Sequence, residues 1–222
     1  MKFHIPFLFA VAALFPATAG AEILLSSLAD TPDSNSADGA IGGAGTLNML
    51  GQAFTTNSNA WDISSIDLAI GSSVGTVDLS VELWSADVSG HLGSELYTLT
   101  TTTADFTGSV APVNFTSTSA IALAADTEYF IVLTNGSTSG TTSIVWNYAT
   151  SISYTGVGSI PATNNFTYAL KTDGITNYGN GTPALFAVNG TAVPEPSTCA
   201  AILGLGALGL GALRRKSLRG RK

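Results

Sequence analysis

Carboxylates are the most plentiful ionisable groups in this sequence. Glycoside hydrolysis needs only two acids, separated by about 5 to 10 Å. Glu82, Glu95 and Glu128 are the candidates for such a pair, and a carboxylate-driven hydrolase is therefore one hypothesis. Carboxylates are usually exposed, so we expect these three to lie on the faces and turns of a β-domain.

Histidine chemistry is much scarcer. The chain has two histidines, and only His91 lies in its central region. Ser-His-Asp catalysis needs a serine and an aspartate placed around its histidine, whereas a lone histidine in a loop is usually a solvated side chain. A histidine zinc site needs several imidazoles, and one is too few. Residues 39–45 are rich in glycine but lack the lysine of a phosphate-binding loop. We therefore predict that the protein is not an enzyme.

Tryptophan offers a second kind of site, because flat rings stack on sugar faces. Trp61 and Trp84 are the candidates. Trp84 falls on the opposite phase from Val81 and Leu83, which form one apolar face of a strand. Core packing is the commoner role of such rings, so a carbohydrate-binding module is the alternative function.

One acidic stretch is a candidate for a metal site. Asp30, Asp33, Asn35 and Asp38 carry the oxygen ligands that Ca²⁺ prefers. Their spacing departs from that of an EF-hand loop. We expect no cofactor, with a structural calcium ion as the minor alternative.

Charge divides the chain into an acidic middle and two basic ends. Of the eight Lys and Arg residues only Lys171 lies between residues 22 and 191, where fourteen of the fifteen carboxylates lie. This middle region repels nucleic acid, so we predict no nucleic-acid partner. The single cysteine, Cys199, lies outside it, which excludes a disulfide there.

The N-terminus has the features of a secretory signal. Lys2 is followed by an apolar run that ends near Phe15, and Ala17-Thr18-Ala19 and Ala19-Gly20-Ala21 are small-x-small sites. This pattern predicts a signal helix over residues 1–21 that signal peptidase removes before Glu22. A retained N-terminal anchor is the alternative.

The C-terminus combines three elements in order. Val193-Pro194-Glu195-Pro196 precedes residues 198–213, which carry no charge, and a basic tail over 214–222. A helix over 198–213 is about 24 Å long, somewhat short of a hydrocarbon core of about 30 Å. Because clustered cations stay cytoplasmic, Arg214, Arg215 and Lys216 place the preceding domain outside the inner membrane.

These three elements together resemble the PEP-CTERM sorting signal of Gram-negative bacteria that make exopolysaccharide. The resemblance covers residues 192–222. It implies that a membrane enzyme, exosortase, processes the tail near Pro194-Glu195-Pro196. The inner membrane would then hold the chain only transiently, before its release to the cell surface or extracellular matrix. An ordinary single-pass tail anchor is the alternative.

Period-two alternation predicts an all-β domain over residues 22–191. Apolar residues alternate at 66–70, 77–83 and 166–170, while residues 129–133 form a continuous apolar run typical of a central strand. A first strand over 23–28, a strand over 144–146 beside the central one and a closing strand over 184–188 complete the set. With frequent Gly and Asn turns, we expect an antiparallel β-sandwich of jelly-roll type, with a β-helix as runner-up. Residues 30–45 are expected to form a loop.

A second resemblance concerns this domain. Gln52-Ala53-Phe54-Thr55-Thr56, Leu83-Trp84-Ser85 and residues 123–130 are similar to the choice-of-anchor class of bacterial surface domains. That class implies a surface location and assigns no functional residue. The sequence thus favours a non-enzymatic, exported surface or matrix protein, sorted by exosortase. A module that binds exopolysaccharide is the alternative.

Overall fold

A computed structural model describes residues 21–32, 40–41, 49–71, 79–100, 110–135, 144–161, 165–169, 176–180 and 183–193. The described part is all-β and contains no helix. The predicted signal helix, apart from Ala21, and the predicted transmembrane helix lie outside these ranges. The strands are β1 (Glu22–Ser26), β2 (Ala40–Ile41), β3 (Met49–Thr55), β4 (Ala60–Gly71), β5 (Leu79–Ala86), β6 (Leu92–Thr100), β7 (Ala111–Leu123), β8 (Glu128–Asn135), β9 (Ile144–Trp146), β10 (Thr155–Gly156), β11 (Asn165–Ala169), β12 (Thr176–Asn180) and β13 (Phe186–Val193).

All pairings between the described strands are antiparallel, and together they form one sheet. Its order is β10-β1-β13-β4-β7-β6-β5-β8-β3-β11-β12, with β9 also paired to β4 and β2 to β9. In the described residues β6 and β7 join at a single pair, Thr100 with Thr116. The sheet is therefore two broad halves connected by a narrow junction.

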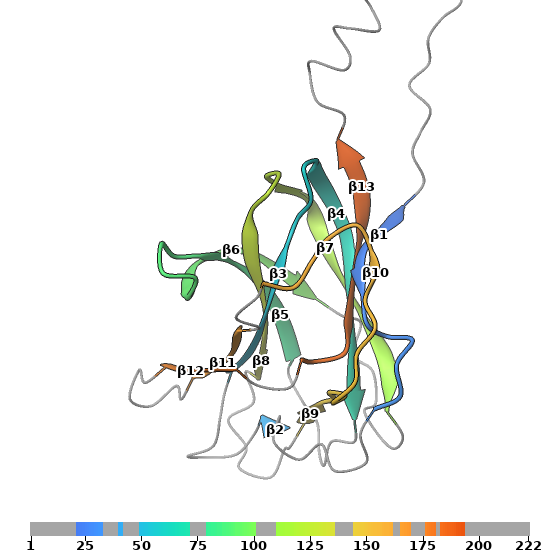
Figure 1. Cartoon of the computed structure of the whole chain (residues 1–222), viewed down its shortest axis with the longest axis vertical. Coiled ribbons are helices and arrows are strands. Elements are labelled where there is room, and N and C mark those ends of the chain that lie inside the picture. Colours follow the sequence, from blue (N-terminus) through green and yellow to red (C-terminus); the bar gives the residue numbers. More distant parts are fainter. Residues whose placement is uncertain are drawn as a thin grey trace, which may run out of the picture.

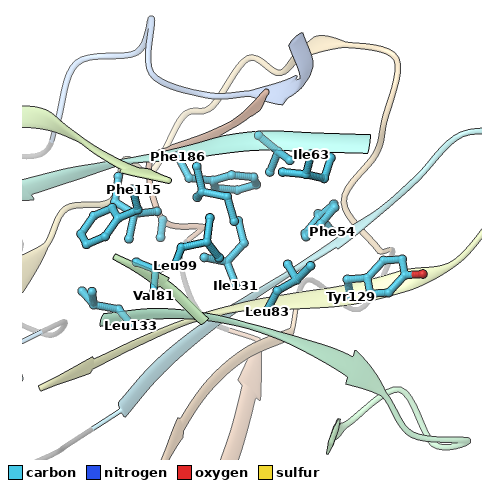
Figure 2. Close-up of a cluster of buried hydrophobic side chains, with 14 of the residues drawn as sticks. Phe54, Ile63, Val81, Leu83, Leu99, Phe115, Tyr129, Ile131, Leu133 and Phe186 are labelled. Carbon is cyan, nitrogen blue, oxygen red and sulfur yellow. The ribbon is translucent and has the colours of Figure 1, made fainter. Parts of the chain in front are cut away.

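The sheet curls so that its two halves face each other across one large apolar cluster (Figure 1). Figure 2 shows side chains of β4, β7 and β13 directed toward those of β5 and β8. Phe115, Phe186, Val81 and Ile131 are fully buried there. Burying each such side chain contributes about 1.5 to 3 kcal/mol, so this cluster is the main source of stability.

The segment around β10 links the two halves on the far side from the β6–β7 junction. The amides of Val157 and Gly158 donate to the carbonyl of Leu24 in β1, at 2.9 and 2.7 Å. Ser159 then exchanges two backbone hydrogen bonds with Thr55 of β3, at 2.7 and 3.0 Å. These bonds satisfy backbone groups that would otherwise be left at sheet edges.

Strand β8 confirms the predicted central strand. Tyr129, Ile131 and Leu133 face the main cluster, whereas Phe130 and Val132 lie in a smaller cluster on the other face of the sheet. Both faces of β8 are therefore buried. This explains why its sequence is a continuous apolar run and does not alternate.

Most of the other predicted strands are present, but one has different neighbours from those predicted. Strands cover the predicted range 66–70 and parts of the predicted ranges 23–28, 77–83, 166–170 and 184–188. The strand over 144–146 pairs with β2 and β4, so its predicted place beside the central strand was wrong. Ala40–Ile41, inside the expected loop, forms β2. The jelly-roll sandwich stays a prediction.

A buried serine connects β1 to the start of β13. The Ser27 hydroxyl accepts a hydrogen bond from the amide of Phe186 at 3.0 Å and lies 3.3 Å from the carbonyls of Ala184 and Phe186. Both Ser27 and Phe186 are fully buried. The hydroxyl thus satisfies an amide that water cannot reach.

We expect Ser27→Ala to lower the free energy of unfolding by about 1 to 3 kcal/mol, because it leaves the buried amide of Phe186 without a partner. Chemical denaturation of the purified protein measures this change. Ser64→Ala is the matched control. It removes one exposed hydroxyl, which donates to the Asn189 carbonyl at 3.1 Å, and should change stability by less than about 0.5 kcal/mol. Equal losses in both variants would contradict the role of Ser27.

Candidate functional site

The sheet leads directly into the predicted sorting motif. Val193, the first residue of that motif, is the last residue of β13 and pairs with Ala60 at the start of β4. Pro194, Glu195 and Pro196 lie outside the described residues, as do Arg214, Arg215 and Lys216. Hydrogen-bonded sheet therefore continues up to the residue before the first proline.

Trp84 lies on the face of β5 that points away from the main cluster. Its neighbours Val81 and Leu83 are fully buried, whereas Trp84 is only partly buried, which confirms the predicted opposite phase. The indole N–H donates to Oε2 of Glu82 at 2.8 Å. This bond fixes the ring edge and leaves the indole with a defined orientation.

A polar ladder continues from Glu82 along the same face. Oε1 of Glu82 accepts a hydrogen bond from the Thr134 hydroxyl at 3.3 Å. The hydroxyls of Thr134 and Ser80 are 2.6 Å apart. Residues two apart on a strand share a face, so Ser80, Glu82 and Trp84 stand in a row. We call these three residues together with Thr134 the outer ladder.

An apolar cluster supports the ring of Trp84. Phe130 pairs with Trp84 across the β5–β8 ladder, and Phe130, Val132 and Ala53 are fully buried. Trp84 packs against this group together with the partly buried Met49, Ala86 and Leu92. The outer ladder is thus a preorganised aromatic and polar surface on a rigid base.

Trp61 requires a correction. The sequence made it a second candidate for sugar stacking, but its side chain is 1 % exposed and belongs to the main cluster. Its indole N–H donates to Oδ1 of Asn57 at 2.8 Å. A ring buried on both faces cannot stack on a sugar, so Trp61 is a core residue.

The three candidate catalytic carboxylates lie on neighbouring strands around Trp84. Glu82 is held by Trp84 and Thr134, as described above. Glu95 pairs with Trp84 across the β5–β6 ladder, and its exposed carboxylate accepts from the Thr98 hydroxyl at 2.7 Å. Glu128 begins β8, two residues before Phe130. The face therefore carries negative charge and, in the described part of the chain, no Lys or Arg balances it.

Glu128 has the most unusual environment of the three. Its Oε1 atom is buried and makes no hydrogen bond in the described part of the structure. Burial raises the pKa of this carboxyl group above its ordinary value of 4.5. Removing water from a carboxylate without offering it donors penalises the charged form, which explains the direction of the shift.

His91 lies in the hairpin between β5 and β6. Asp87 organises this hairpin, because its Oδ1 accepts the amides of Ser89 and His91 at 2.8 and 2.9 Å. Those two bonds lower the pKa of the exposed Asp87 carboxyl. Gly90 has a φ of 74°, which glycine adopts without strain. Ser89-Gly90 is therefore one of the glycine turns that separate the strands, and Asp87 serves it as a structural acceptor.

The start of the predicted calcium stretch is engaged in the fold. Oδ2 of Asp30 accepts the amide of Ser153 at 2.8 Å. Burial, together with the nearby Asp30 charge, raises the pKa of Tyr154 to about 12. Asp33, Asn35 and Asp38 lie outside the described residues. Among the residues that are described, no group of three or more His, Cys, Asp or Glu side chains is placed to hold a metal ion.

Sequence reasoning missed two parts of this surface. Thr134 was not singled out, because its role depends on β8 lying beside β5. Glu82 was considered only as an acid, although its spacing of two residues from Trp84 already places both side chains on one face of a strand. That spacing was the signal that could have identified the pair.

Comparison with known proteins matches the C-terminal region. Residues 192–216 match the PEP-CTERM protein-sorting motif. This motif implies processing by exosortase, a membrane enzyme, and export through the inner membrane to the cell surface. No curated protein matches the chain. Within the ranges described above, no helix has the length and apolar character needed to cross a membrane.

Glu128→Gln tests the effect of burial on the carboxyl group. The folded state holds the proton of the Glu128 carboxyl more tightly than the unfolded state does. The contribution of Glu128 to stability is therefore present below about pH 4, and it is lost as the pH rises through the raised pKa of the folded state. We expect the variant to be more stable than the parent at pH 7, by less than about 1 kcal/mol because the side chain is only partly buried, and to lose this advantage near pH 3.5.

Urea denaturation at the two pH values measures this difference. Glu95→Gln is the control, because it removes the same charge from an exposed position on the same face. A Glu128→Gln advantage that is absent at pH 7, or that Glu95→Gln reproduces in full, would contradict the assignment.

Proposed function

We propose that this protein is a non-enzymatic, exported cell-surface or extracellular-matrix protein whose C-terminal segment is removed by exosortase. The observation that carries the proposal is the sorting motif at residues 192–216, attached without a linker to the last strand of an all-β domain. The proposed parts are a signal peptide over 1–21, a β-domain over 22–191 and a sorting region over 192–222. In the last part, residues 198–213 form the transient membrane span and 214–222 the cytoplasmic end.

The same proposal includes the architecture and surroundings of the domain. Two halves of a sheet that enclose one core and join at Thr100 and Thr116 support a β-sandwich of jelly-roll type and the choice-of-anchor-like class. The acidic middle region would repel nucleic acid, which supports the proposal that nucleic acid is not a partner. We propose a Gram-negative host that makes exopolysaccharide, in which signal peptidase removes the first segment.

Carbohydrate binding is the second candidate, and the outer ladder favours it. Trp84 is partly exposed, its ring edge is fixed by Glu82, and hydroxyl groups from Thr134 and Ser80 lie along the same row. Sugar sites combine an aromatic platform with a few placed polar groups. The ligand of this candidate would be an exopolysaccharide at the cell surface.

Mass spectrometry of the protein recovered from its host tests the proposed processing. We expect a mature chain that ends within or next to Pro194–Pro196 and lacks residues 214–222. Replacing Pro194 and Pro196 with alanine should leave the tail attached, because the extended recognition element is lost. Pro112→Ala, in β7, is the control and should be processed normally. Recovery of the parent with Arg214–Lys222 still attached would contradict the proposal.

Trp84→Ala tests carbohydrate binding. On a glycan array we expect it to weaken binding of any recognised glycan by about tenfold or more, the equivalent of about 1.4 kcal/mol. Trp84→Phe keeps a ring and should lose less. Val88→Ala, at a fully exposed position in the β5–β6 hairpin, is the control. Unchanged binding by a folded Trp84→Ala variant would eliminate the outer ladder as the site.

A further inference from the structure

The end of β13 overlaps the sorting motif and leaves no free chain before Pro194. Ala192 pairs with Trp61 and Val193 with Ala60, so pairing continues to the last residue of the strand. Pro196 is three residues further along. An extended chain spans at most about 3.6 Å per residue, so the Cα of Pro196 lies within about 11 Å of the Cα of Val193. Any enzyme that processes the motif must therefore work close to the folded domain.

Two turns lie near the end of β13, on the side of β4 and β7. They are residues 56–59, between β3 and β4, and residues 124–127, between β7 and β8. We call these two turns the rim. Ala60, the first residue of β4, and Leu123, the last residue of β7, lie next to the rim. Ala60 pairs with Val193, and its neighbour Trp61 pairs with Ala192 of β13 on one side and with Leu123 of β7 on the other. Figure 1 shows both turns at the same end of the molecule as the last residues of β13.

Hydrogen bonds tie the two turns of the rim together. The hydroxyl of Thr56 donates to the carbonyl of Ala124 at 2.7 Å and accepts the amide of Thr127 at 3.0 Å. The amide of Asp126 donates to the carbonyl of Asn57 at 2.8 Å. Asp126 has a φ of 47°, a conformation that this tight turn imposes. The rim is consequently a built surface with a fixed shape.

The first strand begins at the same end. Glu22 at the start of β1 pairs with Gly190 of β13, three residues before Val193. Gly190 is needed there, because a Cβ atom at this position would lie 2.5 Å from the carbonyl oxygen of Asp62. Both ends of the described domain therefore leave the sheet beside the rim (Figure 1).

The side chains of the rim are small and almost all uncharged. Asp126 is the one charged residue in the two turns, and Ser58, Ala124 and Asp126 are exposed. Glu22 and Asp62 add exposed carboxylates nearby. Anionic lipid headgroups would be repelled by this surface. The small neutral side chains of the rim, in contrast, leave no bulky group that would hold another protein surface away from Val193.

From this geometry we infer that the rim is the surface of the folded domain that contacts the outward face of the membrane processing enzyme while it cleaves the tail. The inference rests on the proposed function, because it requires that the motif is processed. It is based on the short distance, at most about 11 Å, between the Cα atoms of Val193 and Pro196. An active site that encloses residues 194–196 must have walls that extend over the turns beside Val193.

Rim variants of the full-length chain test this contact in the host that contains the enzyme. Ser58→Arg and Ser58→Glu add bulk with opposite charges at an exposed rim position. We expect each to lower the initial rate of tail removal by about fivefold or more, as measured by mass spectrometry after a pulse of synthesis. Ser151→Arg and Ser151→Glu make the same changes at an exposed position far from the rim, beside the segment that pairs with Ala184. These controls should be processed at the parent rate.

A linker supplies the rescue. Ten Gly and Ser residues inserted between Val193 and Pro194 add an average reach of about 18 Å. This insertion should restore the processing rate of both Ser58 variants, because the enzyme no longer needs to meet the rim. A loss of rate that the linker does not restore would overturn the inference, since it would indicate a folding defect.

The remaining outcomes separate the inference from the proposed function. If the parent chain is never processed, the proposed function fails. If the parent is processed and the Ser58 variants match it, only the rim contact fails. A change of rate in Ser58→Arg without a change in Ser58→Glu would indicate a charge interaction with lipid and would also overturn the contact with the enzyme.

Discussion

The antiparallel pairing of β13 between β1 and β4 is the constraint on which the rest of the structure depends. It brings Glu22 opposite Gly190 and Val193 opposite Ala60, so both ends of the domain meet at one end of the sheet. It also places Phe186 and Val188 in the main cluster, where they face the side chains of the other half of the sheet. Because the sorting motif begins within β13, the tail leaves the folded domain beside the rim.

The two faces of the second half of the sheet serve different purposes. The inner face of β5 and β8 completes the main core, and the outer face carries a smaller cluster under Trp84. The indole of Trp84 keeps part of its surface accessible because Glu82 fixes its N–H and Phe130 supports its ring. Trp61, in contrast, is buried in the main cluster.

Much of the fold could be predicted from the sequence, because alternation along β4 and β5 and the apolar run of β8 report burial directly. Strand β7 (Ala111–Leu123) was missed. It is rich in Ser and Thr, and only Phe115, Ile121 and Leu123 are buried, so a strand that faces solvent over most of its length gives little hydrophobic signal. The place of β9 beside β4 was also missed, because pairing partners far apart in the chain leave no local trace.

The different positions of Trp61 and Trp84 could not be predicted for the same reason. The sequence shows two similar rings, and only the burial of the Trp61 ring in the main cluster distinguishes them.

Hydrogen exchange of the full-length, membrane-inserted chain tests the central claim most directly. The claim is that β13 stays paired up to Val193 while the sorting motif is still attached. We expect the amides of residues 186–193 to exchange as slowly as those of the central strand β8, because both are hydrogen-bonded within the same cooperative sheet. Exchange of residues 190–193 at the rate of an unstructured peptide would show that the end of β13 is free, and would contradict the account.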